Sequence, residues 1–102
     1  MADYIASVSG DWSNPATWGG SGPPGNGDRI TINSNVVVDV TDSRIVGTSG
    51  VNGTVVVTIN QTSSTTWGTL KIKSGGTLAL RGDSTCNGVF QVEGGGVLEF
   101  DS

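Results

Sequence analysis

Residues 70–80 read Leu-Lys-Ile-Lys-Ser-Gly-Gly-Thr-Leu-Ala-Leu, two short apolar alternations separated by a glycine turn. Two other segments share the pattern: 30–40 (Ile-Thr-Ile-Asn-Ser-Asn-Val-Val-Val-Asp-Val) and 90–100 (Phe-Gln-Val-Glu-Gly-Gly-Gly-Val-Leu-Glu-Phe). The three superpose without gaps, with apolar residues at positions 1, 3, 9 and 11 of each. Because side chains alternate across a strand, these positions share one face. Each segment is therefore predicted to form strand–turn–strand with one buried face.

The three segments start at residues 30, 70 and 90, which indicates a repeat of about 20 residues. A divergent unit is expected near residue 50, with an insertion that reaches into 62–66. One unit cannot close a core, but units stacked about 4.8 Å apart would align their apolar positions. The sequence thus predicts an all-β fold, a short single-stranded parallel β-helix (β-solenoid) of about four rungs. An antiparallel β-sandwich made of hairpins is the alternative.

With 102 residues the chain has room for one domain, 1–102, divided into a capping segment (1–29) and repeated rungs (30–102). Glycine and proline crowd residues 9–28, yet Trp12 and Trp18 lie there too. Two indoles indicate an ordered loop, and we expect it to cover the N-terminal end of the rungs. Asp28 is expected to accept backbone hydrogen bonds in a turn. The alternative is that the two indoles stack on sugar rings of a ligand.

The C-terminal residues Leu98, Glu99 and Phe100 fall in the last predicted strand. No later segment is available in this sequence to cover that strand's edge, and an uncovered edge invites pairing. We expect this edge to be an assembly surface, for self-association or for a partner chain; the alternative is that the chain has been excised from a longer one.

Charge and composition exclude several classes of partner. The net charge is −4 with five Lys and Arg, too few to neutralise a row of nucleic-acid phosphates. No apolar run approaches the ~20 residues of a membrane span, so no membrane insertion is expected. The first residues show neither the basic nor the apolar region of a signal peptide. The single cysteine, Cys86, excludes an intrachain disulfide.

The sequence offers little catalytic chemistry. It contains no histidine, so Cys86 has no imidazole to activate it. Asp39, Glu93 and Glu99 occupy predicted outward positions, where polysaccharide-cleaving enzymes place paired carboxylates; a solvated outer face is the simpler interpretation. We therefore predict that the chain is not an enzyme and has no catalytic, cofactor-binding or metal-binding residues.

Calcium is the one candidate ion, because carboxylate and amide oxygens suit it, although no ligand loop with regular spacing is present. Its candidate ligands are Asn33, Asp28, Asp39 and Asp42. A separate short motif, Arg81-Gly82-Asp83, is the tripeptide that integrins read, and it is also ordinary turn chemistry. We expect this motif in an exposed loop between two units.

The N-terminal third also resembles a known family, best over residues 9–40. The shared runs are Gly10-Asp11-Trp12-Ser13, Thr17-Trp18-Gly19-Gly20, Pro24-Gly25 and Gly27-Asp28-Arg29-Ile30-Thr31-Ile32. They resemble the opening of the eight-glycine domain of animal and bacterial surface proteins, and similar openings occur in phage tail and spike-like proteins. The resemblance implies β-strand pairs beside a parallel β-helix. It implies no catalytic residue.

These observations lead to a functional expectation: a non-catalytic structural or adhesive module of a virion tail or a bacterial cell surface. Its location would be the virion or the extracellular surface. A carbohydrate-binding module, with a glycan as partner, is the alternative. A fragment of a polysaccharide-active enzyme ranks behind both.

Overall fold

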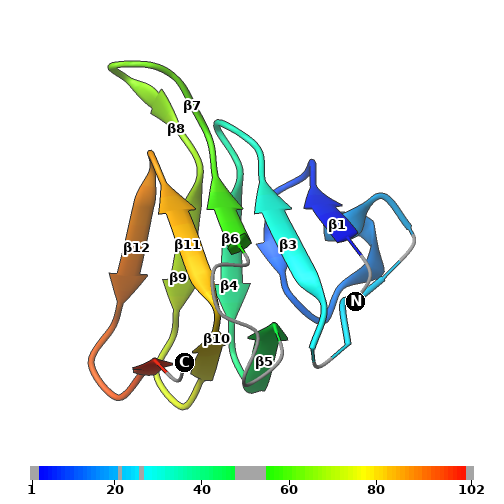
Figure 1. Cartoon of the computed structure of the whole chain (residues 1–102), viewed down its shortest axis with the longest axis vertical. Helices are drawn as coiled ribbons and strands as arrows, with labels where there is room; N and C mark the ends of the chain where they lie inside the picture. The colour runs from blue at the N-terminus through cyan, green and yellow to red at the C-terminus, as the bar shows by residue number, and fades with distance from the viewer. Residues whose placement is uncertain (1–2, 21, 26, 48–54, 101–102) are drawn as a thin grey trace.

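The computed structural model describes residues 3–20, 22–25, 27–47 and 55–100. It is an all-β structure with three parallel sheets that do not close on themselves. Figure 1 shows the strands running alongside one another, with the N-terminal strands and the strand β12 at opposite sides of the molecule. Its principal extents are 35 × 27 × 27 Å.

The strands are shared among the three sheets in a regular way. The first sheet contains β1 (Asp3–Ala6), β3 (Arg29–Ile32), β6 (Val55–Ile59) and β11 (Asp83–Cys86). The second sheet contains β2 (Gly10–Asp11), β4 (Val37–Val40), β9 (Thr69–Ile72) and β12 (Val89–Val92). The third sheet contains β5 (Ser43–Gly47), β10 (Thr77–Arg81) and β13 (Val97–Phe100).

The chain passes from the first sheet to the second and then to the third, and it repeats this order. Within each of these sheets, a strand pairs in parallel with the next strand of the same sheet along the chain. We call each passage of the chain through the sheets a layer. The first layer is β1 and β2, the second is β3, β4 and β5, the third is β6, β9 and β10, and the fourth is β11, β12 and β13. The antiparallel pairing of the alternative prediction occurs, in the part of the chain that the structure describes, only between β7 and β8.

The register corrects the phase of the predicted repeat. Leu70 pairs with Val38 and with Phe90, whereas Ile30 pairs with Val57. The segment 30–40 therefore joins the first sheet to the second, while 70–80 and 90–100 join the second to the third. The predicted superposition of 30–40 on 70–80 is therefore wrong: the first strand of 70–80 corresponds to the second strand of 30–40.

The error arose because the connection from the first sheet to the second and the connection from the second to the third use the same kind of turn. The N–H groups of Val36, Gly76 and Gly96 each donate to the carbonyl three residues earlier, at 3.3, 2.9 and 2.8 Å. The third residue of each turn is left-handed, with φ of 64° at Asn35, 86° at Gly75 and 87° at Gly95. A positive φ at the third residue but not at the second is typical of a type II turn, in which glycine and asparagine favour the third position. The local pattern thus identifies a turn but not which two sheets the turn connects.

The predicted divergent unit contains an insertion. Val55–Ile59 forms β6 and pairs with β3, so strand material lies where the repeat required it; the expected unit start near residue 50 falls outside the described residues. Between β6 and β9 the chain forms a hairpin of β7 (Gln61–Ser63) and β8 (Thr66–Trp67). The hairpin projects beyond the ends of the neighbouring strands (Figure 1).

The segment 1–29 is more than a cap. Its β1 pairs with β3 and its β2 with β4, and Asp28 forms a parallel bridge with Val46 of β5. The prediction missed these strands because β1 contains only a short alternation of polar and apolar residues, and the two residues of β2 contain no apolar residue. The same segment also contains the 3-10 helix η1 (Pro15–Trp18).

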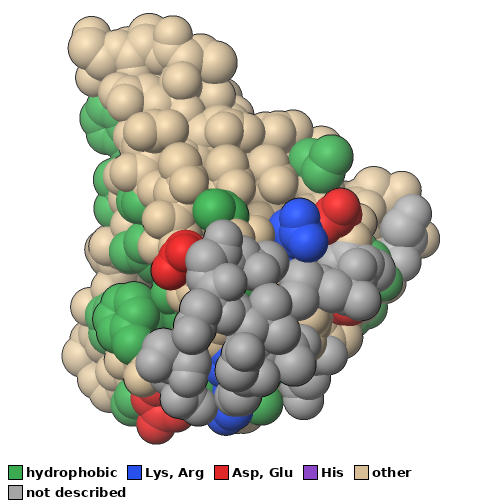
Figure 2. Space-filling model, viewed as in Figure 1, with side chains coloured by type: hydrophobic (Ala, Val, Ile, Leu, Met, Phe, Trp, Pro, Cys, Tyr) green, Lys and Arg blue, Asp and Glu red, His purple; other side chains and the backbone are tan. Residues whose placement is uncertain are grey.

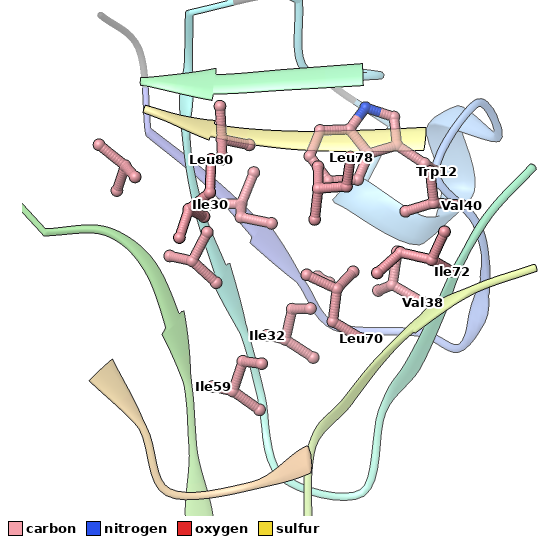
Figure 3. Close-up of a cluster of buried hydrophobic side chains, with 14 of the residues drawn as sticks. Trp12, Ile30, Ile32, Val38, Val40, Ile59, Leu70, Ile72, Leu78 and Leu80 are labelled. Carbon is pink, nitrogen blue, oxygen red and sulfur yellow. The ribbon is translucent and has the colours of Figure 1, made fainter. Parts of the chain in front are cut away.

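The core lies between the three sheets, where inward side chains of successive layers stack (Figure 3). One such row contains Val40, Ile72 and Val92, and a second contains Ile32, Ile59 and Cys86. The layers approach closely at their corners: a Cβ added at Gly76 would meet the Val40 carbonyl oxygen, so the close approach requires glycine there.

Candidate functional site

The two ends of the stacked layers differ, and the N-terminal end carries a lid of aromatic side chains. Asn14 caps η1 by accepting a hydrogen bond from the Ala16 N–H at 3.1 Å, and Pro15 supplies the fixed φ of the first helical residue. This short helix places Trp18 against Trp12, with ring centroids 5.3 Å apart at 70°. Tyr4 of β1 meets Trp18 edge-on at 6.4 Å.

Hydrogen bonds fix both indoles. The Trp18 Nε1–H donates to the Trp12 carbonyl at 2.7 Å, and the Trp12 Nε1–H donates to the Pro24 carbonyl at 3.2 Å. Only 1% of Trp12 and 3% of Trp18 is exposed, and both belong to the central core. The burial agrees with the predicted lid. It leaves neither ring with a face for a sugar, so the ligand interpretation of these two residues is corrected.

Asp28 is a turn residue, as its position predicted. Its Oδ2 accepts the Gly25 N–H at 2.8 Å, and its backbone accepts from the Gly47 N–H at 3.1 Å. Within the described ranges, no three His, Cys, Asp or Glu side chains are grouped so that they could hold a metal ion. The structure therefore does not bring Asp28, Asp39 and Asp42 together as a calcium site.

The opposite end of the sheets is open. β11, β12 and β13 are the outermost strands of the first, second and third sheets, and no described strand pairs with their outer edges. Their inward positions repeat those of the buried third layer, but solvent reaches them: Val92 is 45% exposed, whereas Ile72, which pairs with it, is fully buried. Hydrophobic side chains are visible along the margin where β12 lies (Figure 2).

We call this surface the open end and define it by five apolar residues of the fourth layer, Phe90, Val92, Val97, Leu98 and Phe100. Phe90 and Leu98 are half-buried and pack against the core. Phe100 is 72% exposed and Val97 44%. Of the predicted edge, Leu98 thus contacts the core while Glu99 and Phe100 face solvent. The sequence prediction missed the β12 side chains, although the inward positions of 90–100 contain the signal.

The outward carboxylates considered for catalysis do not form a glycosidase pair. The Lys73 Nζ lies 2.8 Å from Glu93 Oε1, and the hydrogen bond from Lys73 lowers the pKa of Glu93 below its ordinary value. The same contact raises the pKa of Lys73. A glycosidase general acid needs the opposite shift. Asp39 lies in β4 and Glu99 in β13, in different sheets.

The motif Arg81-Gly82-Asp83 is not a free loop. Arg81 is the last residue of β10 and Asp83 the first of β11, so one glycine separates two strands. Arg81 and Gly82 are half-buried, and only Asp83 is exposed. The expectation of an exposed loop is corrected for the first two residues. Cys86, at the end of β11, is exposed, and its Sγ donates to the Gly88 carbonyl at 3.3 Å.

The hairpin β7–β8 is a further exposed feature. Trp67 at its base is 39% exposed, unlike the two tryptophans of the lid. The other residues of the hairpin, 61–66, are one glutamine and five serines and threonines, most of them exposed.

No family model matches the chain, and no curated protein or solved structure matches it. Among the described residues, no helix has the length and apolar character to cross a membrane.

Proposed function

We propose that the chain is a non-catalytic structural or adhesive module that assembles through its open end. The observation that carries the proposal is the asymmetry of the core. Trp12 and Trp18 close one end and are each less than 4% exposed, whereas Val92 and Phe100 at the other end are 45% and 72% exposed. Contiguous exposed apolar residues beside unpaired strand edges are typical of interaction surfaces.

The architecture we propose is a short parallel β-helix of four rungs, each layer being one rung. The parallel pairing, the rotation of the chain through three sheets and the stacked inward rows support it. A crystal structure with the same three-sheet rotation would establish it. Hairpins running antiparallel in the main sheets would refute it.

A virion tail or a bacterial cell surface is the setting we propose. The resemblance of residues 9–40 to the opening of the eight-glycine domain and of phage tail proteins supports this setting. Genes for tail or surface proteins beside the coding gene would strengthen the proposal, and a neighbourhood of unrelated metabolic genes would count against it.

Assembly through the open end is tested by sedimentation velocity at rising protein concentration and at two salt concentrations. Salt from about 0.1 M to about 1 M shortens the screening length from about 10 Å to about 3 Å, which weakens repulsion between like-charged copies. We therefore expect concentration-dependent self-association that increases with salt.

The matched variants are Phe100→Ser at the open end and Val8→Ser in the first layer. Both residues are exposed, at 72% and 55%, so neither substitution should unfold the chain. Phe100→Ser should weaken the association and Val8→Ser should leave it unchanged. Equal effects of the two variants, or a monomer under all conditions, would contradict self-association through this end.

Carbohydrate binding is the second candidate, and Trp67 is the observation that favours it. An exposed indole beside hydroxyl and amide side chains can stack on a sugar ring and hydrogen-bond its hydroxyl groups. A glycan array should then give hits that Trp67→Ala removes, and titration should change tryptophan fluorescence. An array without hits would eliminate this candidate.

A further inference from the structure

Acidic and basic side chains face one another where successive layers meet. Asp3 of the first layer pairs in register with Arg29 of the second, with Arg29 Nε 3.2 Å from Asp3 Oδ1. Lys73 of the third layer meets Glu93 of the fourth at 2.8 Å.

The junction between the second and third layers also contains an acidic and a basic residue in register. Asp39 of β4 is in register with Lys71 of β9 on the outer face of the second sheet. Neighbouring residues on the same face of paired strands interact, and opposite charges there are favourable. Each of the three junctions thus contains one acidic–basic pair, although Asp11 of β2 is also in register with Asp39 at the first junction.

The charged side chains of the fourth layer are carboxylates only. Residues 83–100 contain Asp83, Glu93 and Glu99 and neither Lys nor Arg. Asp83 lies in the first sheet, Glu93 directly follows the second-sheet strand β12, and Glu99 lies in the third sheet. Asp83 and Glu99 are exposed. On its inner side Glu99 is in register with Ala79, which offers no charge.

We propose that the open end binds a strand-forming segment of a partner chain whose outward residues are Lys or Arg. On β13 the complementary strand would place a basic residue beside Glu99. Its neighbours on either side would be apolar and would cover Leu98 and Phe100. This inference rests on the proposed assembly function and names the partner's chemistry.

A second copy of the chain fits this surface less well. Two copies joined at their open ends would bring both sets of carboxylates together, and like charges on facing strands are unfavourable. A basic partner instead adds an acidic–basic contact of the kind found at each of the three junctions. The lid formed by Trp12 and Trp18 leaves the other end without an equivalent open core.

The test uses two synthetic peptides and the chain itself. The acidic peptide copies residues 89–100, and the basic peptide carries Glu93→Lys and Glu99→Lys. Each has an N-terminal fluorophore, and fluorescence anisotropy reports its binding. The basic peptide should bind about tenfold more tightly at low salt, because two repulsive contacts become attractive ones, each of modest strength. The difference should shrink at about 1 M salt.

Charge reversal in the protein supplies the control. Glu99→Lys should weaken binding of the basic peptide and improve that of the acidic peptide, whereas Asp11→Lys, in the first layer, should leave the preference unchanged. Equal binding of the two peptides, or a preference that Glu99→Lys does not alter, would overturn the inference.

Binding of neither peptide would overturn it as well. Salt-dependent self-association that Phe100→Ser weakens would still support the proposed function in that case. The partner chemistry and the assembly role can therefore fail separately.

Discussion

At the N-terminal end of the molecule, two indoles and a 3-10 helix cover the first layer. At the other end, the fourth layer repeats the inward pattern of the third but leaves it in contact with solvent. The same strand geometry thus gives a closed core at one end and an exposed one at the other. The comparison teaches that alternation alone does not bury a side chain, because each inward row also needs a layer or a lid beyond it.

The largest effect is expected from removing the lid. Trp12→Ala should lower the free energy of unfolding by about 3–5 kcal/mol, because it opens a large cavity in the core. Trp67→Ala, at a 39% exposed tryptophan, should cost less than about 1 kcal/mol. Urea denaturation followed by circular dichroism measures both. If Trp12→Ala prevents folding, Trp12→Phe gives a milder value, and similar costs for Trp12 and Trp67 would contradict the lid.

A matched pair within one row compares the third and fourth layers directly. Ile72 is fully buried, and Val92, in register with it, is 45% exposed. Ile72→Ala should cost about 2–5 kcal/mol and Val92→Ala less than about 1 kcal/mol. Equal costs in denaturation experiments on the monomer would show that the fourth layer is buried in solution.

The core and the strand pattern were accessible from the sequence because they depend on local alternation. The inward residues Ile30, Ile32, Leu70, Ile72 and Leu78 are all buried as predicted. The phase of the repeat was not accessible, because turns centred on Asn35 and Gly75 look alike locally but lie at different corners. Distinguishing them requires the pairing partner, which is a long-range property.

The candidate site was predictable only in part. Phe100 and Glu99 were named from their place in the last strand, and the structure exposes both. The ion pair of Lys73 with Glu93 was not foreseen, since it depends on which layers are adjacent. Nor could the sequence alone show that Trp67 lies exposed while Trp12 and Trp18 lie buried, because all three occur in turn-rich or polar segments.

The smallest effect concerns the ion pair between the third and fourth layers. The pKa of Glu93 is lowered by Lys73, so the pair stabilises the folded chain above the ordinary glutamate pKa and this contribution is lost as the pH falls through the lowered value. Glu93→Gln should therefore be less stable than the wild type near pH 7, and the difference should vanish once the pH lies below the lowered pKa of Glu93.

Both side chains are solvent-accessible, so the stability difference should be small and should decrease with salt. Denaturation midpoints at several pH values measure it, and Glu99→Gln is the control because Glu99 has no ion pair in the described part of the chain. A difference that is constant with pH would contradict the assigned pair.

The contrast between the two ends is tested most directly by amide hydrogen exchange with mass spectrometry, compared segment by segment. At low protein concentration, residues 83–100 should exchange much faster than 69–81, because the fourth layer has few buried contacts to oppose local opening. Residues 10–18, which form the lid, should be protected. Adding the basic peptide should protect 83–100 and leave 10–18 unchanged. Equal protection of 83–100 and 69–81 in the isolated chain would contradict an open fourth layer.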